Sequence, residues 1–226
     1  MKYSKIKKAS FISRPNRFVA YVNLDGERVA CHVKNTGRCR ELLVDGAEVY
    51  LEESDNENRK YKYSLVTVRK GDRLVNMDSQ APNKIVGEWL KDSGFFSDMK
   101  LLRAETTYKK SRFDFYCEYE DKKAFIEVKG VTLERDGVVL FPDAPTERGA
   151  RHVNELCECL NEGYQAYIIF VVQMSDVLYF TPSADNDPKF AEALRKADDA
   201  GVKIIALTCS VSEDEVTVLG EIPVKL

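Results

Sequence analysis

The feature that most constrains the fold is a change of pattern at Pro82-Asn83. Before this point, short β-type runs alternate with turn signals such as Asp25-Gly26 and Asp45-Gly46. After it, runs with helical periodicity alternate with strand-like runs. The sequence therefore predicts two domains, residues 1–82 and 83–226.

Short strands dominate the first predicted domain. Five strand-like runs are expected, at 11–24 (interrupted by Pro15), 28–33, 47–51, 61–68 and 74–77. A short helical turn is expected at 38–43. Five short strands with one small helix are typical of a compact barrel of the OB kind.

The second predicted domain mixes helices with strands. Helices are expected from Asn83 to about Gly94, at 146–161 and at 188–200, and strands at 100–108, 112–119, 123–129, 166–172 and 202–207. This order indicates an α/β sandwich, and the apolar run 166–172 is expected to be buried on both faces.

Composition and charge narrow the class of protein. The chain is 44% hydrophobic and 31% charged, as in ordinary globular proteins. Its apolar runs are far shorter than the ~20 residues that span a bilayer, and Arg14 arrives before a signal peptide could form. We therefore expect a cytoplasmic protein with no membrane partner.

The six cysteines and two histidines offer no zinc-site spacing. The cysteines contain no C-x-x-C pair, and only His32 and His152 could join them. We interpret the cysteines as core or near-surface thiols. A disulfide framework is not expected in a chain of this size.

The net charge of −3 is distributed unevenly. Residues 1–83 carry 16 Lys and Arg against 11 Asp and Glu, and the remainder carries 18 against 26. A basic half beside an acidic half is consistent with a nucleic-acid-binding domain joined to a domain that holds cations.

The two runs 112–119 and 123–129 predict a β-hairpin that turns at Glu120-Asp121. In this register, residues whose numbers sum to 241 face each other. One face then pairs the apolar residues 113 with 128, 115 with 126 and 117 with 124. The opposite face places Asp114 across from Glu127.

Two carboxylates in that arrangement suit a hard divalent cation. Directly opposed like charges destabilise a sheet unless a cation lies between them, and two oxygen ligands with water suit Mg²⁺ or Mn²⁺. Lys129 follows Glu127 by two residues and shares its face, where an ammonium could orient water or neutralise charge on a phosphate. The alternative interpretation is a solvated row of ion pairs, and the spacing alone leaves both open.

These residues resemble a known family. Asp114 with Glu127-Val128-Lys129 resembles the PD-(D/E)XK nuclease core, although Phe113 replaces the proline in the name of that motif. The longer matches are to the sugar fermentation stimulation protein A family: Arg14-Pro-Asn-Arg-Phe, His32-Val-Lys-Asn-Thr-Gly-Arg-Cys-Arg-Glu-Leu-Leu, Ser111-Arg-Phe-Asp-Phe, Glu127-Val-Lys-Gly-Val-Thr-Leu, Phe141-Pro-Asp-Ala and Thr146-Glu-Arg-Gly. Lys110 stands where the family pattern leads us to expect glycine. The resemblance covers about residues 10 to 205.

The resemblance implies an N-terminal OB-like barrel and a C-terminal PD-(D/E)XK nuclease-like α/β sandwich. It also implies DNA binding and a historical link to the regulation of sugar utilisation. It does not by itself establish catalysis, because the family name records a phenotype.

Several further residues are candidates for the site. Glu105 is expected to complete the catalytic set of Asp114, Glu127 and Lys129, with Glu88 as its competitor. The expected nucleic-acid contacts are Arg14, Arg17, Asn35, Arg38, Arg40, Arg112, Arg148 and His152. Thr36 lies among the first of these. For each of these residues, the alternative is a solvated or purely structural role.

Two main hypotheses follow. The first is a Mg²⁺- or Mn²⁺-dependent nuclease in which Asp114 and Glu127 hold the metal. The second is a non-catalytic DNA-binding regulator of sugar (maltose) utilisation genes, for which we expect strongly salt-dependent binding. DNA is the expected partner, while RNA and a homodimer remain open, and no small-molecule cofactor is implied. An enzyme acting on sugars ranks third, because the chain has no Gly-rich phosphate loop.

Overall fold

The first domain is a closed barrel of strands, as predicted. The computed structural model describes residues 1–35 and 37–226. Five strands pair in the order β3-β2-β1-β4-β5, and a parallel pairing of β3 with β5 closes the ring. β6 pairs with residues 67–70 of β5, which follow the residues of β5 that pair with β3. The strands are β1 (Ile6–Asn16), β2 (Val19–Leu24), β3 (Glu27–Val33), β4 (Glu48–Glu53), β5 (Tyr63–Lys70) and β6 (Arg73–Asn76).

Of two local expectations for the barrel, one is corrected and one is confirmed. The run 11–24 forms two strands, because the chain turns at residues 17 and 18, where the Asn16 side chain accepts a hydrogen bond from the Phe18 backbone N–H at 2.9 Å. The helical turn expected at 38–43 is present as a single turn at residues 40–42, closed by the Leu43 N–H, which donates to the Cys39 carbonyl at 2.9 Å. The loop geometry at both places is set by local hydrogen bonds rather than by hydrophobic periodicity.

The second domain is built around a six-stranded mixed sheet, with the strand order β15-β14-β12-β9-β8-β7. Its strands are β7 (Met99–Tyr108), β8 (Ser111–Tyr119), β9 (Lys122–Val131), β12 (Gln165–Val172), β14 (Lys203–Val211) and β15 (Val216–Ile222). The three helices are α1 (Ala81–Asp92), α2 (Glu147–Asn161) and α3 (Pro188–Ala200). β12 runs parallel to both β9 and β14.

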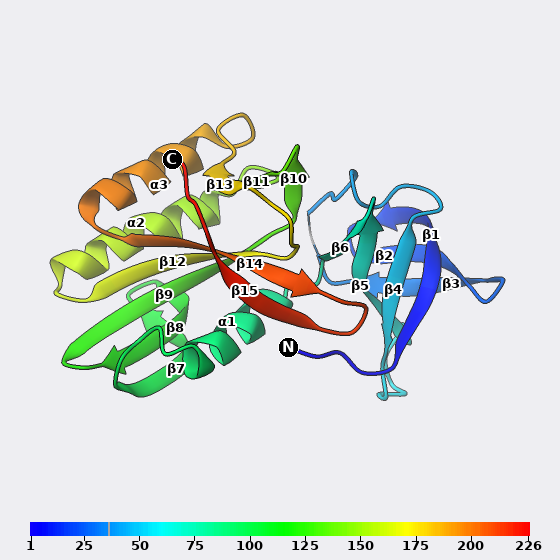
Figure 1. Ribbon diagram of the computed structural model, residues 1–226, viewed down its shortest axis with the longest axis horizontal. Coiled ribbons are helices and arrows are strands. Elements are labelled where there is room, and N and C mark those ends of the chain that lie inside the picture. Colours follow the sequence, from blue (N-terminus) through cyan, green and yellow to red (C-terminus); the bar gives the residue numbers. More distant parts are fainter. Residues whose placement is uncertain (36) are drawn as a thin grey trace.

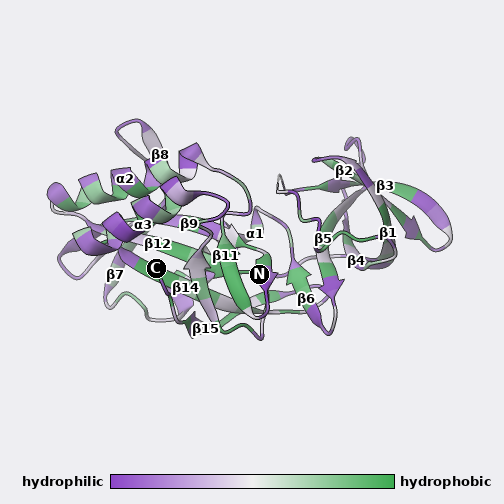
Figure 2. Cartoon of the chain, turned by 90° about the horizontal axis from the view of Figure 1, so that it is seen from above, coloured by the Kyte–Doolittle hydropathy of each residue, from purple (hydrophilic) through white to green (hydrophobic). Residues whose placement is uncertain are grey.

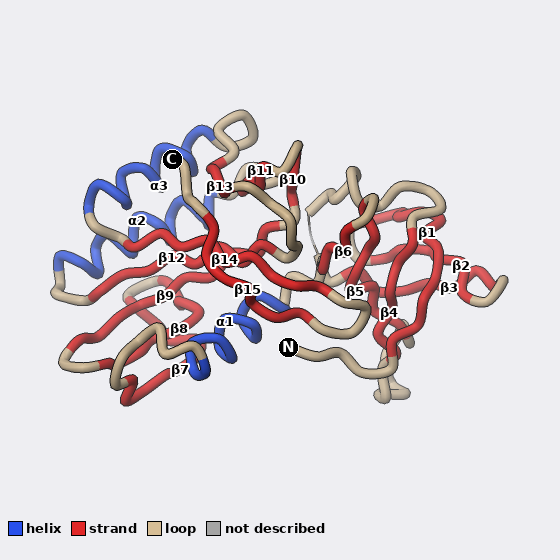
Figure 3. Tube along the Cα trace, viewed as in Figure 1, coloured by secondary structure: helices blue, strands red, loops and turns tan. Residues whose placement is uncertain are grey.

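The helices cover the two faces of this sheet. α2 and α3 pack on one face and α1 on the other, so alternate residues of β12 belong to two separate apolar clusters. The expected burial of this strand on both faces is confirmed, because seven of its eight residues are buried. Figure 3 shows that the helices all belong to this half of the molecule. In Figure 2, hydrophilic residues (purple) alternate with hydrophobic residues (green) along α2 and α3. No helix in the described ranges combines the length and apolar character needed to cross a membrane.

Four strands were not predicted. β10 (Leu133–Arg135), β11 (Val138–Phe141) and β13 (Tyr179–Pro182) form a small separate sheet. Runs of three or four residues are too short to show a period of two. The fourth, β15, is an edge strand in which most side chains are exposed or half-buried, so its hydrophobic pattern is weak.

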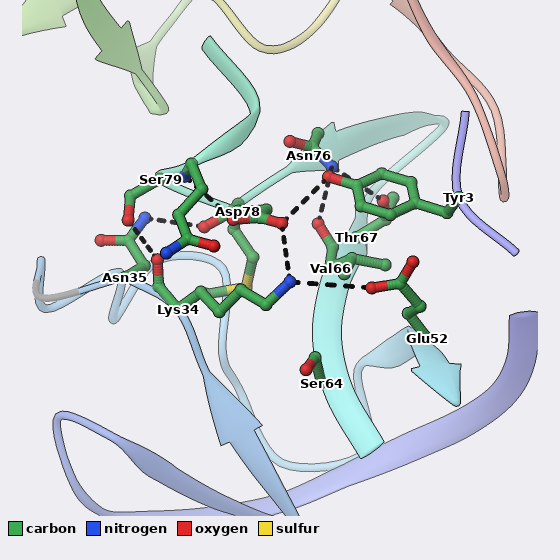
Figure 4. Close-up of polar contacts among 12 residues, drawn as sticks. Tyr3, Lys34, Asn35, Glu52, Ser64, Val66, Thr67, Asn76, Asp78 and Ser79 are labelled. Atoms are coloured by element: carbon green, nitrogen blue, oxygen red, sulfur yellow. Dashed lines mark hydrogen bonds and ion pairs between the residues drawn. The ribbon is translucent and has the colours of Figure 1, made fainter. Parts of the chain in front are cut away.

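A buried polar network joins the barrel to the second domain. Gln173, which directly follows β12, donates its amide Nε2–H to Asn76 Oδ1 at 2.7 Å and to the Asp78 carbonyl at 3.1 Å. Asn76 in turn donates to the Tyr3 hydroxyl at 2.9 Å, and Lys34 Nζ lies 3.3 Å from Asp78 Oδ2 (Figure 4). Buried amides satisfied in this way fix the position of one domain against the other.

The N-terminal residues also cross between the two halves. Met1 and Tyr3 hydrogen-bond with the backbone at the start of β15, and the Met1 amino group lies 2.7 Å from Glu88 Oε2. In Figure 1 the N-terminus accordingly lies beside β15, between the barrel and the large sheet. The first few residues therefore pack with the second domain, although they precede the barrel in the sequence.

The Gln173 amide makes the junction testable. Gln173→Leu leaves the buried Asn76 Oδ1 without its donor, and we expect the free energy of unfolding to fall by about 1–3 kcal/mol. Urea denaturation measures this change. Gln80→Leu is the matched control, because the Gln80 side chain is exposed and should be replaceable at little cost. Equal urea midpoints for Gln173→Leu and the wild type would show that the amide does not stabilise the junction.

Candidate functional site

The β8–β9 hairpin has the predicted register until it reaches Asp114. The pairs from Tyr119–Lys122 to Phe115–Ile126 are those whose numbers sum to 241. The ladder ends there, one pair before Asp114 and Glu127. Asp114 Oδ2 instead accepts a hydrogen bond from the Val128 backbone N–H at 2.7 Å.

This irregularity reverses the side of the sheet on which Phe113 lies. Phe113 was expected to share a face with Phe115 and Val128, but it packs with Phe125 in the cluster under α2. On the neighbouring strand, Glu105 has a left-handed φ of +53° opposite the same point. A local break of this kind re-aims a side chain, and here it turns the Asp114 carboxylate toward β9 and α1.

Asn83 is a site residue that the sequence analysis missed. It lies in the first turn of α1, and its amide Nδ2–H donates to Asp114 Oδ1 at 2.7 Å. Pro82-Asn83 was interpreted only as the boundary between domains. The signal that could have found it is the position of a polar amide at the start of a helix that packs on the hairpin.

Glu127 is the most enclosed charged residue of the site, with 2% of its surface exposed. Its Oε1 receives two donors, Lys129 Nζ and His152 Nδ1, the latter at 2.6 Å. Its Oε2 is buried and has no hydrogen-bond partner among the described residues. One carboxylate oxygen is therefore fixed from two sides, while the other is left free.

The two carboxyl groups have opposite pKa shifts. Burial and the nearby charge of Glu127 raise the pKa of Asp114, and its hydrogen bonds with Val128 and Asn83 only partly oppose this. Burial also acts to raise the pKa of Glu127, but the hydrogen bond with His152 and the charge of Lys129 outweigh it and hold that pKa below its usual range. In the absence of other ions, Glu127 is the carboxylate that more readily carries the negative charge.

The donor set fits a hard divalent cation. The free, buried Oε2 of Glu127 is an oxygen ligand without a partner, and Asp114 supplies a second carboxylate nearby. Mg²⁺ is commonly bound by one or two carboxylates, with water completing its shell. Within residues 1–35 and 37–226, no group of three or more His, Cys, Asp or Glu side chains is placed to hold a metal ion.

Glu105 and Glu88 are both directed elsewhere, so the expectation of a third acidic ligand is corrected. The Glu105 side chain is 65% exposed and lies 3.5 Å from Arg112 Nη1. Glu88 is paired with the amino group of Met1. Arg112, expected to contact nucleic acid, is exposed and forms this surface pair with Glu105.

The two candidates on α2, Arg148 and His152, have different environments. Arg148 is exposed, as a nucleic-acid contact requires, and its Nε lies 3.4 Å from His152 Nε2. His152 is 2% exposed and bonded to Glu127, so it cannot reach a phosphate directly. The expected phosphate contact for His152 is corrected, because the face of α2 that carries it is turned toward the sheet.

Two of the barrel candidates have structural contacts instead of free polar groups. The Arg14 guanidinium donates to backbone carbonyls of the surrounding loops, including those of Gly37 at 2.8 Å and Asn35 at 2.6 Å. The Asn35 side chain bridges the Met77 carbonyl and the Gly37 N–H. Both side chains hold loops together, which corrects their expected direct role. Thr36, grouped with them, lies outside the described residues.

Three of the candidate arginines of the barrel are exposed. Arg17, Arg38 and Arg40 are solvent-exposed and line a hollow of about 400 Å³ on the barrel surface. The Arg17 guanidinium lies 5.0 Å from the ring centre of Phe18, which is itself 48% exposed. Guanidinium groups beside an exposed aromatic ring can contact phosphates and stack on bases.

The two carboxyl groups should make stability in EDTA depend on pH in opposite directions. The lowered pKa of Glu127 means that its ionised form stabilises the fold above its usual pKa of 4.5 and that this stability is lost as pH falls. The raised pKa of Asp114 means that its protonated form stabilises the fold below 3.8 and that this stability is lost as pH rises. We therefore expect the cost of Glu127→Gln, about 1–3 kcal/mol at neutral pH, to fall as pH falls, and the cost of Asp114→Asn to rise as pH falls.

Urea denaturation near neutral pH and near pH 4 measures both differences. Asp121→Asn, at the fully exposed hairpin turn, is the control for removing a surface carboxylate from the same hairpin. A change of both differences in the same direction between the two pH values would contradict the opposite pKa shifts.

Comparisons with known proteins agree over the whole chain. The family model described as the sugar fermentation stimulation protein RE domain matches residues 80–215, and the one described as the SfsA N-terminal OB domain matches residues 12–77. Curated relatives from Desulfitobacterium hafniense (strain Y51) and Ruminiclostridium cellulolyticum are each 54% identical over 226 residues, covering 100% of this chain and 99% and 100% of theirs. Both are called sugar fermentation stimulation protein homolog.

A solved structure is similar in fold across both domains. The structure of Pyrococcus furiosus SfsA in complex with Ca²⁺ matches with a TM-score of 0.91 and 27% sequence identity, covering 100% of this chain and 98% of that one. The expected family resemblance is confirmed by these matches: the chain belongs to the sugar fermentation stimulation protein (SfsA) family.

Proposed function

We propose that this protein is a divalent-metal-dependent nuclease of the PD-(D/E)XK type that acts on DNA. The observation that carries the proposal is the buried Glu127 carboxylate, which has one oxygen fixed by Lys129 and His152 and the other without a partner, and whose charge acts on Asp114. A buried carboxylate oxygen without a partner is costly unless a ligand satisfies it. A metal ion is the ligand that suits two carboxylates.

Asp114 and Glu127 would hold Mg²⁺ or Mn²⁺. When bound there, the ion would polarise a phosphate oxygen and lower the pKa of a coordinated water. Asn83 and the Val128 N–H hold the Asp114 carboxylate in place. Lys129 brings an ammonium beside the same site, where it can orient water and stabilise negative charge on the phosphate.

The exposed arginines would grip the nucleic acid. Arg17, Arg38 and Arg40 offer guanidinium groups on the barrel, and Arg148 offers one at the start of α2. Phosphate contacts by such groups give affinity without sequence preference. This arrangement supports DNA as the partner, and RNA would meet the same groups.

The Pyrococcus furiosus relative supports a cation site. That protein of the same family was solved in complex with Ca²⁺. Ca²⁺ and Mg²⁺ both take oxygen ligands, so the relative is consistent with the donor set of Asp114 and Glu127.

Lys129→Ala tests the proposed reaction. We expect Mg²⁺- or Mn²⁺-dependent cleavage of end-labelled DNA to fall about 100- to 1000-fold, because one stabilising charge is lost. DNA affinity should be largely retained, since the arginines are intact. Lys123→Ala is the matched control, because it removes an exposed lysine from the same strand. Absence of metal-dependent cleavage by the wild type, on single- and double-stranded DNA and RNA, would reject the nuclease.

A second function is favoured by one observation. Lys129 and His152 both bond Glu127 Oε1, so much of the site's charge is already balanced within the protein. This suits a DNA-binding protein that keeps the site for structure and regulates sugar-utilisation genes without turnover. In that case Lys129→Ala would leave the regulatory function unchanged.

Both functions require the arginines of the barrel. We expect the double variant Arg38→Ala/Arg40→Ala to weaken DNA binding and to reduce the slope of log affinity against log salt by roughly 0.7–0.9 for each phosphate that the variant no longer binds. Fluorescence anisotropy over a series of salt concentrations measures this slope. Arg195→Ala, on the exposed face of α3, is the control for removal of a surface arginine. An unchanged slope in the double variant would place the nucleic-acid contact elsewhere.

A further inference from the structure

His152 is a buried histidine that contacts the buried carboxylate of Glu127. It lies in the second turn of α2, and its ring packs edge-on against Phe113, with ring centres 6.0 Å apart. Its Nδ1 lies 2.6 Å from Glu127 Oε1. A buried histidine bonded to a buried carboxylate fixes the orientation of that carboxylate as well as its own.

The start of α2 is held firmly enough to aim this ring. Thr146 caps the helix by accepting a hydrogen bond from the Gly149 N–H at 3.0 Å. The Thr146 N–H itself donates to the Asp187 side chain at 2.8 Å, and Asp187 is the N-cap residue of α3. The N-terminal ends of α2 and α3 are therefore held together, close to the turn of α2 that carries His152.

The contacts of the ring define its tautomer. Arg148 can act only as a donor, and its Nε lies 3.4 Å from His152 Nε2, so Nε2 must supply a lone pair. Glu127 Oε1 already accepts a hydrogen bond from Lys129, so the other ring nitrogen acts as a donor to this oxygen. The proton that His152 directs at Glu127 Oε1 accordingly lies on Nδ1.

Two donors thereby hold the same oxygen from different elements. Lys129 reaches Oε1 from the same strand as Glu127, and His152 reaches it from α2. With Oε1 occupied, the carboxylate can present only Oε2 to a further ligand. Oε2 is the buried oxygen with no partner among residues 1–35 and 37–226.

We propose that His152 is a positioning residue: its Nδ1–H holds Glu127 so that Oε2 faces the divalent cation, and Arg148 fixes the tautomer from the surface. This inference rests on the proposed metal-dependent function. It replaces the direct phosphate contact expected from the sequence with an indirect role, acting through the carboxylate.

The tautomer can be observed without any metal. In apo protein labelled with ¹⁵N in the imidazole rings, the chain gives signals from only two histidines, and a His152 variant assigns them. We expect the proton that faces Glu127 to lie on Nδ1 of His152 and to be protected from exchange. His32, which is half-buried and on the barrel, is the internal control. A proton found on Nε2 with none on Nδ1 would overturn the proposal.

Two substitutions of His152 then distinguish the position of the donor nitrogen from the size of the side chain. The amide nitrogen of His152→Asn lies as far along the side chain as Nδ1, whereas that of His152→Gln lies as far as Nε2. We expect His152→Gln to weaken Mn²⁺ binding, measured by calorimetry, by roughly 10- to 100-fold. His152→Asn should stay near the wild-type affinity. DNA affinity in EDTA should be unchanged in both, because His152 does not contact phosphate.

The outcomes are distinguishable from failure of the proposed function. No Mn²⁺ binding by the wild type would overturn the metal site and this inference together. Mn²⁺ binding by the wild type and equal losses in the Asn and Gln variants would overturn the positioning role alone. A loss of DNA affinity in EDTA in both variants would favour a direct phosphate contact and also overturn it.

Discussion

The burial of a charged carboxylate at Glu127 organises the site. Removing a carboxylate from water is strongly unfavourable unless donors replace the lost hydration, and two donors do so here. Lys129 comes from the same strand, but His152 must come from a helix that crosses the sheet. The packing of α2 against β9 is thus tied to the electrostatics of one side chain, and the apolar contacts of Phe113 and Phe125 support the same arrangement.

The barrel and the α/β domain share a framework of buried polar contacts. Gln173 extends from the central strand into the barrel, and Glu134 pairs with Lys70 at 2.6 Å at a second point of contact. Because these groups are largely buried, separating the domains would expose donors and acceptors that have matched partners. The exposed arginines of the barrel and the carboxylates of the hairpin are therefore carried by one connected structure.

Much of this arrangement could be predicted where a regular period extends over many residues. The hairpin register followed from apolar pairs such as Phe115 with Ile126, and the burial of β12 followed from an unbroken apolar run. The break at Asp114 could not be predicted, because it depends on an Asn83 amide from a helix thirty-one residues earlier and on a backbone N–H of the facing strand. The alternation of apolar and polar residues in β8, taken alone, continues through Asp114 without a sign of the break.

The residues whose roles changed are those defined by long-range hydrogen bonds. Arg14 and Asn35 look like phosphate contacts in sequence, since both types bind phosphate when free, but their donors are used by backbone carbonyls. His152 lies on a helix face that the sequence left ambiguous between solvent and core. In each case the residue type was informative, and its partner was set by tertiary structure.

The single tryptophan of the chain gives the two-part architecture a spectroscopic consequence. Trp89 lies on α1, half-buried against Phe95 with ring centres 4.8 Å apart, and the barrel contains no tryptophan. Its fluorescence therefore reports the α/β domain alone, whereas far-ultraviolet circular dichroism reports the strands of both. Coincidence of the two signals during denaturation measures whether the halves unfold as one cooperative unit.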